Sequence, residues 1–247
     1  MKSSVKNGFF TLLIVISAGP LASAQTSSQP PSADAVVAKM MELDARRQTE
    51  LAGYAAVRRY VAVNRKRRAE MLVRVTCGSD GARQFSILSE EGSSAIRKHV
   101  FYKLLQEETE ASRRGTRDST RLTPENYDFH FIGQETLETG PAYVLAVVPK
   151  TENKYLIDGK VWIDAADYAI VRIEGRPARN PSFWVHSVHF VHTYQKVHQF
   201  WFAFSTHTSS QVRFFGAAEL IIENSGYALN PQPGYAHARP QEAKLAQ

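Results

Sequence analysis

Three histidines at three-residue intervals are the residues of this chain whose types and spacing most suggest chemistry. On a helix, His186, His189 and His192 could converge on one metal ion. The residues around them predict a strand instead, in which side chains alternate between the two faces of a sheet. His186 and His192 would then share a face, about 20 Å apart at the usual rise per residue, with His189 on the other face. We therefore expect no metal to be bound.

Recognisable catalytic motifs are missing from the sequence. It contains no Gly-x-Ser-x-Gly nucleophile elbow, no glycine-rich phosphate loop and no zinc-type His-Glu helix. Several acidic residues lie near predicted strand ends, where carboxylates are common without any catalytic role. We predict that the protein is not an enzyme and uses no cofactor, and a secreted hydrolase is the least favoured function considered.

The most basic segment of the chain is a predicted turn between two strands. Its residues are Arg65, Lys66, Arg67 and Arg68, with Arg58 and Arg59 shortly before it. Such a turn could contact anionic lipid headgroups or an acidic partner. More often it is a solvated hairpin tip whose charges also discourage pairing between sheet edges.

The N-terminus has the pattern of a secretory signal peptide over residues 1–24. Lys2 and Lys6 precede the apolar run Phe9–Ile16, and the small residues Ala22–Ala24 precede Gln25. This order of charge, apolar run and small residues predicts cleavage after Ala24 and a periplasmic location. No cysteine comes directly after the apolar run, so a lipid-anchored mature form is not expected.

Cleavage would leave 28 basic and 24 acidic residues, a net charge of +4 against +6 for the whole chain. This small excess permits contact with anionic surfaces but does not indicate nucleic acid, which we do not expect as a partner. The only cysteine is Cys77, which excludes an intramolecular disulfide. About 220 residues remain, enough for one large domain.

Hydrophobic periodicity predicts a single domain over residues 32–229, after a polar linker at 25–31 and before a disordered tail at 230–247. Ser32 would cap a first amphipathic helix, and Ser94–Arg114 would form a second. The predicted strands are Tyr54–Asn64, Ala69–Cys77, Arg83–Leu88, Tyr127–Ile132, Ala142–Val148, Tyr155–Asp164, Ala169–Gly175, Trp184–Val197, Phe200–Ser209 and Gln211–Glu223.

The segment Asp158–Asn180 is the clearest predicted hairpin, with a short turn at Ala165–Asp167. In its second strand Val171 and Ile173 alternate with Arg172 and Glu174, which predicts a half-buried sheet with the charged pair facing out.

These elements predict an α+β fold: a strongly curved antiparallel β-sheet with the helices laid over its concave apolar face. A curved sheet of this kind can leave an interior cavity for an apolar ligand. The residues expected to line it are Val100, Phe101, Leu104, Leu105, Trp162, Phe200, Phe202, Phe204, Phe214, Leu220 and Ile222. Trp162 fits least well, because it shares its strand parity with Lys160 and Asp164.

Several strand and turn motifs resemble the outer-membrane lipoprotein-sorting (LolA-like) superfamily. They are Tyr143–Leu145, Pro149-Lys150, Gly159–Asp164, Ala169–Gly175 and Pro181–Trp184. The resemblance covers residues 127–226 and is closer to the broad group of secreted LolA-like proteins than to the dedicated lipoprotein carrier. It implies a half-open barrel, closed by helices around a hydrophobic cavity that takes acyl chains.

From this resemblance we expect a periplasmic, non-catalytic carrier or sensor that binds lipids or lipoprotein acyl chains and takes part in cell-envelope lipid and lipoprotein trafficking. Its partners would be a lipid or an acylated lipoprotein, with transient contact with the membrane surface or envelope proteins. The alternative is an envelope protein-interaction or stress-sensor module with a closed cavity.

Overall fold

The computed structural model describes residues 31–112, 118–180, 185–213 and 216–230, which belong to the compact unit beginning at Pro31. The predicted signal peptide, most of the linker, the Pro181–Trp184 motif, Phe214 and the tail from residue 231 lie outside these ranges. No helix in the described ranges is long and apolar enough to cross a membrane.

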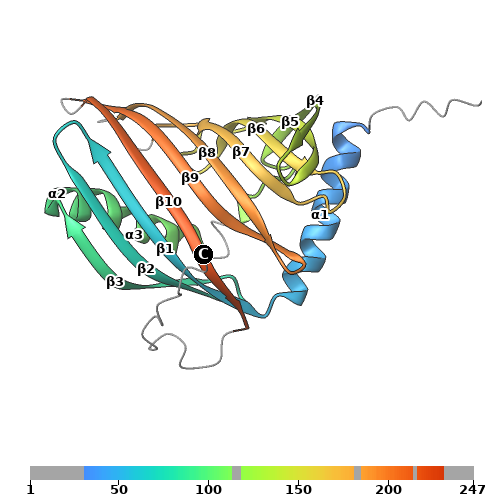
Figure 1. The fold of residues 1–247 in the computed structure, drawn as a ribbon. Helices are drawn as coiled ribbons and strands as arrows, with labels where there is room; N and C mark the ends of the chain where they lie inside the picture. The colour runs from blue at the N-terminus through green and yellow to red at the C-terminus, as the bar shows by residue number, and fades with distance from the viewer. Residues whose placement is uncertain (1–30, 113–117, 181–184, 214–215, 231–247) are drawn as a thin grey trace, which may run out of the picture. The chain divides into compact units, whose positions relative to one another are not determined.

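Ten strands form one curved antiparallel sheet (Figure 1). They are β1 (Gly53–Asn64), β2 (Arg68–Gly78), β3 (Arg83–Gly92), β4 (Tyr127–Leu137), β5 (Gly140–Pro149), β6 (Ile157–Asp164), β7 (Ile170–Pro177), β8 (Val185–Val197), β9 (Phe200–Val212) and β10 (Gly216–Leu229). Their order is β3-β2-β1-β10-β9-β8-β7-β6-β5-β4, so the first and last strands of the chain pair in the middle. The predicted α+β fold with a curved antiparallel sheet is confirmed.

One predicted strand, Gln211–Glu223, is wrong. Gln211 and Val212 end β9, and β10 begins at Gly216, whose positive φ of 73° is a backbone conformation that glycine adopts readily. The apolar alternation continues on both sides of this turn, so it looked like one strand in the sequence.

The predicted first helix is α1 (Ala33–Glu50). Ser32 caps it as expected, because its side-chain oxygen accepts a hydrogen bond of 3.2 Å from the backbone N–H of Ala35. Val36, Val37 and Met40 are buried on its inner side.

The second predicted helix runs from Ser94 to Ala111 in three parts. These are α2 (Ser94–Ile96), a π-helical turn η1 (Arg97–Phe101) and α3 (Tyr102–Ala111). A π-turn holds more residues than an α-turn and so rotates the side chains on either side of it relative to each other. Arg113 and Arg114, included in the predicted helix, lie outside the described residues.

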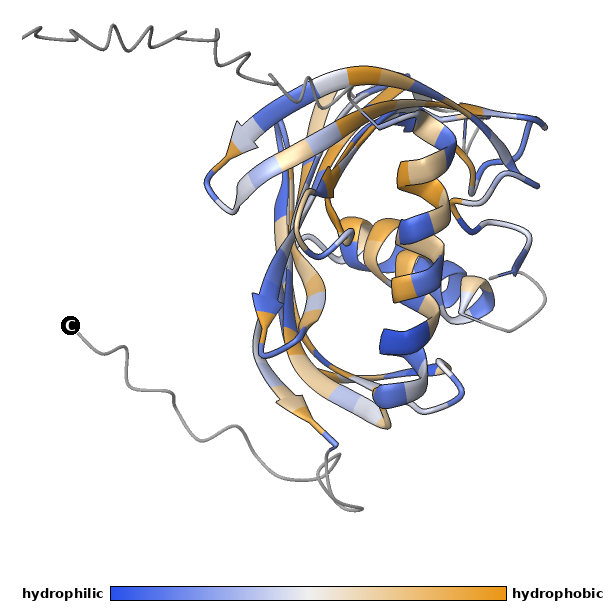
Figure 2. Cartoon of the chain, turned by 90° about the vertical axis from the view of Figure 1, so that its right-hand side faces the viewer, coloured by the Kyte–Doolittle hydropathy of each residue, from blue (hydrophilic) through white to orange (hydrophobic). Residues whose placement is uncertain are grey.

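Two apolar clusters join the helices to the sheet, and Figure 2 shows both helical segments inside its curve. The α1 cluster contains Val36, Val37, Met40, Tyr127, Leu145, Val147, Leu156, Val161, Ile163 and Ile173. The α3 cluster contains Tyr60, Ala62, Ala69, Met71, Val73, Ile96 and Phe101. The concave face is therefore apolar at both ends of the sheet.

The β6–β7 hairpin forms where the sequence predicted it. The Asp164 side chain accepts hydrogen bonds from the backbone N–H groups of Ala166, at 3.0 Å, and Asp167, at 2.6 Å. Farther along, Gly159 pairs with Gly175, and a Cβ on Gly159 would come within 2.1 Å of the Glu174 carbonyl oxygen. The two glycines thus allow a close approach of the backbones.

Candidate functional site

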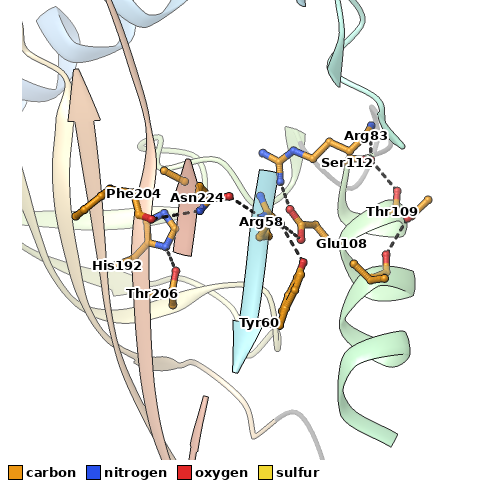
Figure 3. A network of polar contacts seen from close by, with 12 residues as sticks. Arg58, Tyr60, Arg83, Glu108, Thr109, Ser112, His192, Phe204, Thr206 and Asn224 are labelled. Carbon is orange, nitrogen blue, oxygen red and sulfur yellow. Dashed lines mark hydrogen bonds and ion pairs between the residues drawn. The ribbon is translucent and has the colours of Figure 1, made fainter. Parts of the chain in front are cut away.

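Two arginines share one glutamate where α3 faces the sheet (Figure 3). Arg58 Nη1 donates to Glu108 Oε2 at 2.5 Å, and Arg83 Nη1 donates to Glu108 Oε1 at 2.6 Å. The Arg58 side chain is 8% exposed, that of Glu108 23% and that of Arg83 38%. We call Arg58, Glu108 and Arg83 the charge cluster.

Strand and helix periodicity bring these side chains together. In β1, Arg58 lies on the same face as Tyr60, while its neighbour Arg59 points to the opposite face. On α3, Glu108 lies one turn after Leu104, which packs against the α3 cluster. Packing of the helix therefore carries the carboxylate over β1.

Hydrogen bonds extend the charge cluster across the middle of the sheet. Arg58 Nε donates to Asn224 Oδ1 at 2.7 Å, and Arg58 Nη1 donates to the Tyr60 hydroxyl at 3.2 Å. Asn224 is 4% exposed and donates to the Phe204 carbonyl oxygen at 3.5 Å. One network thus connects β9, β10 and β1 to α3.

The charge cluster also connects to the end of α3. The backbone N–H of Arg83 donates to Ser112 Oγ at 3.4 Å, and that hydroxyl donates to the Thr109 carbonyl oxygen at 2.8 Å. The last turn of the helix is thereby tied to the start of β3.

The cluster carries one more positive charge than negative. Burial raises the pKa of Glu108, but the charges of Arg58 and Arg83 lower it further, so that its net pKa is below its usual value. Burial would lower the pKa of Arg58, but the Glu108 carboxylate raises it overall. In the part of the chain that the structure describes, Glu108 is the only acid that forms an ion pair with either arginine. Three ionised groups therefore give a net charge of +1.

His192 lies beside this network and adds no charge at neutral pH. Its Nδ1 and Thr206 Oγ1 share a hydrogen bond of 2.5 Å. Burial, followed by the positive charges of Arg58 and Arg83, lowers the pKa of His192 to about 4. The positive charge beside the network at neutral pH therefore comes from the arginines and not from this imidazole.

The predicted separation of the histidines is confirmed for the two with described side chains. His189 Nε2 lies 3.6 Å from Glu174, whereas His192 contacts Thr206 and Tyr194. The side chain of His186 lies outside the description. Among the described residues, no group of three or more His, Cys, Asp or Glu side chains is arranged to hold a metal ion.

Six of the predicted ligand-binding residues come together on the concave face. Phe101 is fully buried in the α3 cluster. The other five pack against the α3 cluster and are only partly buried: Val100, Leu104, Leu105, Leu220 and Ile222. The predicted stripe on the second helix therefore meets the predicted face of β10.

The phenylalanines of β9 do not all behave as predicted. Phe200 and Phe202 are buried, and the ring of Phe202 lies 4.9 Å from that of Tyr54 and 4.6 Å from that of Tyr227. Phe204 is 49% exposed, which corrects its predicted inward position. The ladder between β8 and β9 skips Phe204, pairing Ser205 with Thr193 and Ala203 with Tyr194, so the alternation changes there.

Trp162 is not on the concave face, and this prediction is wrong. It packs with Ala142, Val144 and Val171 in a third cluster, while its neighbour Val161 belongs to the α1 cluster. Adjacent strand residues point to opposite faces, so Trp162 faces outward, as its parity with Lys160 implied. Its indole N–H donates to Glu135 at 2.8 Å, and Arg172 lies over its ring at 4.8 Å.

Val171 departs from the predicted alternation for a similar reason. Trp162 pairs with Arg172 and Ile163 with Ile170, which leaves Val171 as an extra residue at a bulge. It therefore packs on the outer face, whereas Ile173 lies in the α1 cluster as predicted. Arg172 and Glu174 form an outward-facing ion pair of 2.6 Å.

The basic turn is the exposed tip of the β1–β2 hairpin. Asn64 Oδ1 accepts hydrogen bonds from the backbone N–H groups of Lys66 and Arg67. The exposed residues of this turn are Arg65, Lys66, Arg67 and Arg68. Arg58, considered with them in the sequence, is instead buried in the charge cluster, and Arg59 pairs with Glu70.

Sequence reasoning missed the charge cluster. Two adjacent arginines in a strand must point to opposite faces, so one of Arg58 and Arg59 had to face the apolar side. Glu108 follows Leu104 by four residues and so lies on the same face of the helix. These two signals indicate one inward-facing arginine and one inward-facing glutamate, but not that the two side chains meet.

Comparisons with known proteins add structural neighbours only. No protein-family model matches the chain, and no curated protein matches it. A DUF1329 family protein from Desulfovibrio piger is 10% identical with a TM-score of 0.44, covering 82% of this chain and 95% of its own. A protein from Vibrio parahaemolyticus described as an outer membrane lipoprotein-sorting protein domain is 13% identical, with a TM-score of 0.42, covering 81% and 94%.

A LolA superfamily protein from Nitrosomonas europaea is 9% identical, with a TM-score of 0.38 and coverage of 82% of this chain and 96% of its own. All three neighbours are at most 13% identical to this chain.

Proposed function

We propose that this protein is a non-catalytic periplasmic carrier or sensor of lipids or lipoprotein acyl chains. The acyl chain of the ligand would lie between the sheet and the helical segment α2–α3. The observation that carries this proposal is the apolar surface on both the helix and the sheet. It is formed by residues that pack against the α3 cluster and remain only partly buried: Val100, Leu104, Leu105, Leu220 and Ile222. The signal-peptide pattern of residues 1–24 supports the periplasmic location.

Burial of an acyl chain is sufficient to drive such binding. Each buried methylene contributes about 0.8 kcal/mol, so a chain that buries about twelve gains roughly 10 kcal/mol before the entropic cost of association. The exposed basic turn at residues 65–68 could assist by contacting an anionic membrane surface.

Two measurements test the proposal. Lipid extraction of the purified native protein, followed by mass spectrometry, should recover an acylated compound at close to one per protein. A fluorescent fatty acid should bind the wild type, and Leu104→Asp should weaken its binding at least tenfold, because a charge would then face the acyl chain.

Ile132→Asp is the matched control, because Ile132 is an exposed isoleucine, 50% accessible, on β4 at the opposite end of the strand order from β3. It should bind as the wild type does. Circular dichroism must show that both variants are folded. Equal binding by a folded Leu104→Asp protein would place the ligand elsewhere and contradict the proposed position.

A second candidate function is a protein-interaction module. The edge strands β3 and β4 each carry an exposed isoleucine, Ile87 at 46% and Ile132 at 50% accessibility. Open edges can accept a strand from a partner. A folded wild-type protein that carries no lipid and binds no fatty acid would favour this function over the carrier.

A further inference from the structure

We propose that the charge cluster binds the anionic head of the ligand, a carboxylate or a phosphate, so that the protein selects anionic amphiphiles over neutral ones. This inference rests on the proposed function and adds the chemical class of the ligand.

The first argument is the uncompensated charge. Arg58 and Arg83 share a single carboxylate, which leaves a net charge of +1 next to an apolar layer. An excess of partly buried positive charge is unfavourable, so a monoanion that entered this position would balance it and be stabilised there.

The second argument is that donors remain available on Arg83. In the described part of the chain its guanidinium makes one hydrogen bond, to Glu108, and none of its nitrogen atoms is both buried and unsatisfied. A guanidinium has five N–H groups. The side chain is 38% exposed, so the unused donors can be reached from outside. Their planar arrangement suits two oxygens of a carboxylate or phosphate.

The third argument is the position of the cluster beside the apolar surface. Arg58 donates to the Tyr60 hydroxyl, and the Tyr60 ring belongs to the α3 cluster, 5.8 Å from the ring of Phe101. Glu108 lies one helical turn from Leu104. A head group at Arg83 would therefore leave its acyl chain against the proposed binding surface, as an amphiphile requires.

The test compares three ligands with the same chain: oleate, methyl oleate and oleoyl lysophosphatidate. We expect the wild type to bind oleate or the lysophosphatidate, or both, at least tenfold more tightly than methyl oleate. The stronger of the two anionic ligands identifies a carboxylate or a phosphate head. Raising the salt concentration should weaken binding of the anionic ligands and leave methyl oleate unchanged.

Arg83→Gln should reduce the affinity for the anionic ligands to that for methyl oleate without changing methyl oleate binding. Arg83→Lys should keep part of the preference. Arg59→Gln, which removes an arginine from the opposite face, is the control and should behave as the wild type does.

The outcomes separate this inference from the proposed function. Equal, salt-independent affinity of the wild type for all three ligands would overturn the anion site and leave the carrier function standing. Binding of none of the three ligands would overturn both. Because the salt series uses only wild-type protein, the result holds even if Arg83→Gln does not fold.

Discussion

Replacing Glu108 with glutamine should destabilise the protein much more than the same change at an exposed glutamate. Glu108 accepts hydrogen bonds from two arginines, at 2.5 and 2.6 Å, and one of them, Arg58, is almost completely buried. Glutamine has nearly the same shape but removes the negative charge. Arg58 and Arg83 would then repel each other with no carboxylate between them.

The expected loss of stability depends on how deeply each of the two ion pairs of Glu108 is buried. Breaking a buried ion pair by neutralising one partner costs about 3–5 kcal/mol, whereas exposed pairs contribute about 0–1 kcal/mol. Arg58 is 8% exposed but Arg83 is 38% exposed, so only the first bond counts in full. We expect the free energy of unfolding to fall by about 3 kcal/mol. For a domain of roughly 200 residues this lowers Tm by about 6–12 °C.

Glu70 provides a matched control, because it also pairs with two arginines. Arg59 and Arg68 lie 2.6 and 3.3 Å from its carboxylate, but these side chains are 41% and 57% exposed and that of Glu70 35%. Glu70→Gln should cost at most about 1 kcal/mol. Urea unfolding followed by circular dichroism measures both variants under the same conditions.

The pH dependence gives an independent check. The folded-state pKa of Glu108 is lowered below its ordinary value of 4.5, so its contribution is fully present above that value and is lost as pH falls through the folded pKa. The difference in the free energy of unfolding between wild type and Glu108→Gln should therefore become smaller at the lowest pH at which both proteins still fold. If Glu108→Gln costs no more than Glu70→Gln at neutral pH, the charge cluster does not stabilise the fold and this reasoning is refuted.

Three further predictions concern separate parts of the molecule. The pKa of His192 is lowered from 6.5 to about 4, so the free energy of unfolding of the wild type should fall by about 3 kcal/mol as pH falls from 6.5 to 4. His192→Gln should remove this loss of stability and His189→Gln should not. Urea unfolding across that pH range measures all three proteins. Ser32→Ala should lower the free energy of unfolding by about 1 kcal/mol, because Ser32 caps α1. Ser93→Ala should lower it clearly less, because the Ser93 side chain makes no capping hydrogen bond; thermal unfolding measures both variants. Trp162→Phe should lower Tm but change fatty-acid affinity less than twofold, since Trp162 lies on the outer face; a tenfold loss in a folded variant would contradict that placement.

Local sequence signals determined the elements and their buried faces. Ser32 predicted the start of α1, and the alternation around Arg172 and Glu174 predicted an outward-facing pair. The apolar stripe from Val100 to Leu105 predicted which side of the second helix meets the sheet. Such features depend on residues within one or two turns or strand steps, so periodicity is sufficient to find them.

Only the tertiary structure decided where those faces meet and where the alternation changes. Bulges at Phe204 and Val171 move side chains relative to the expected parity, and their positions depend on pairing with neighbouring strands. The charge cluster depends on sheet order as well, since Arg58 meets Glu108 across 50 residues and Asn224 across 166. These contacts exist because β1 pairs with β10 in the middle of the sheet while α3 covers β1, an arrangement that no local pattern in the sequence encodes.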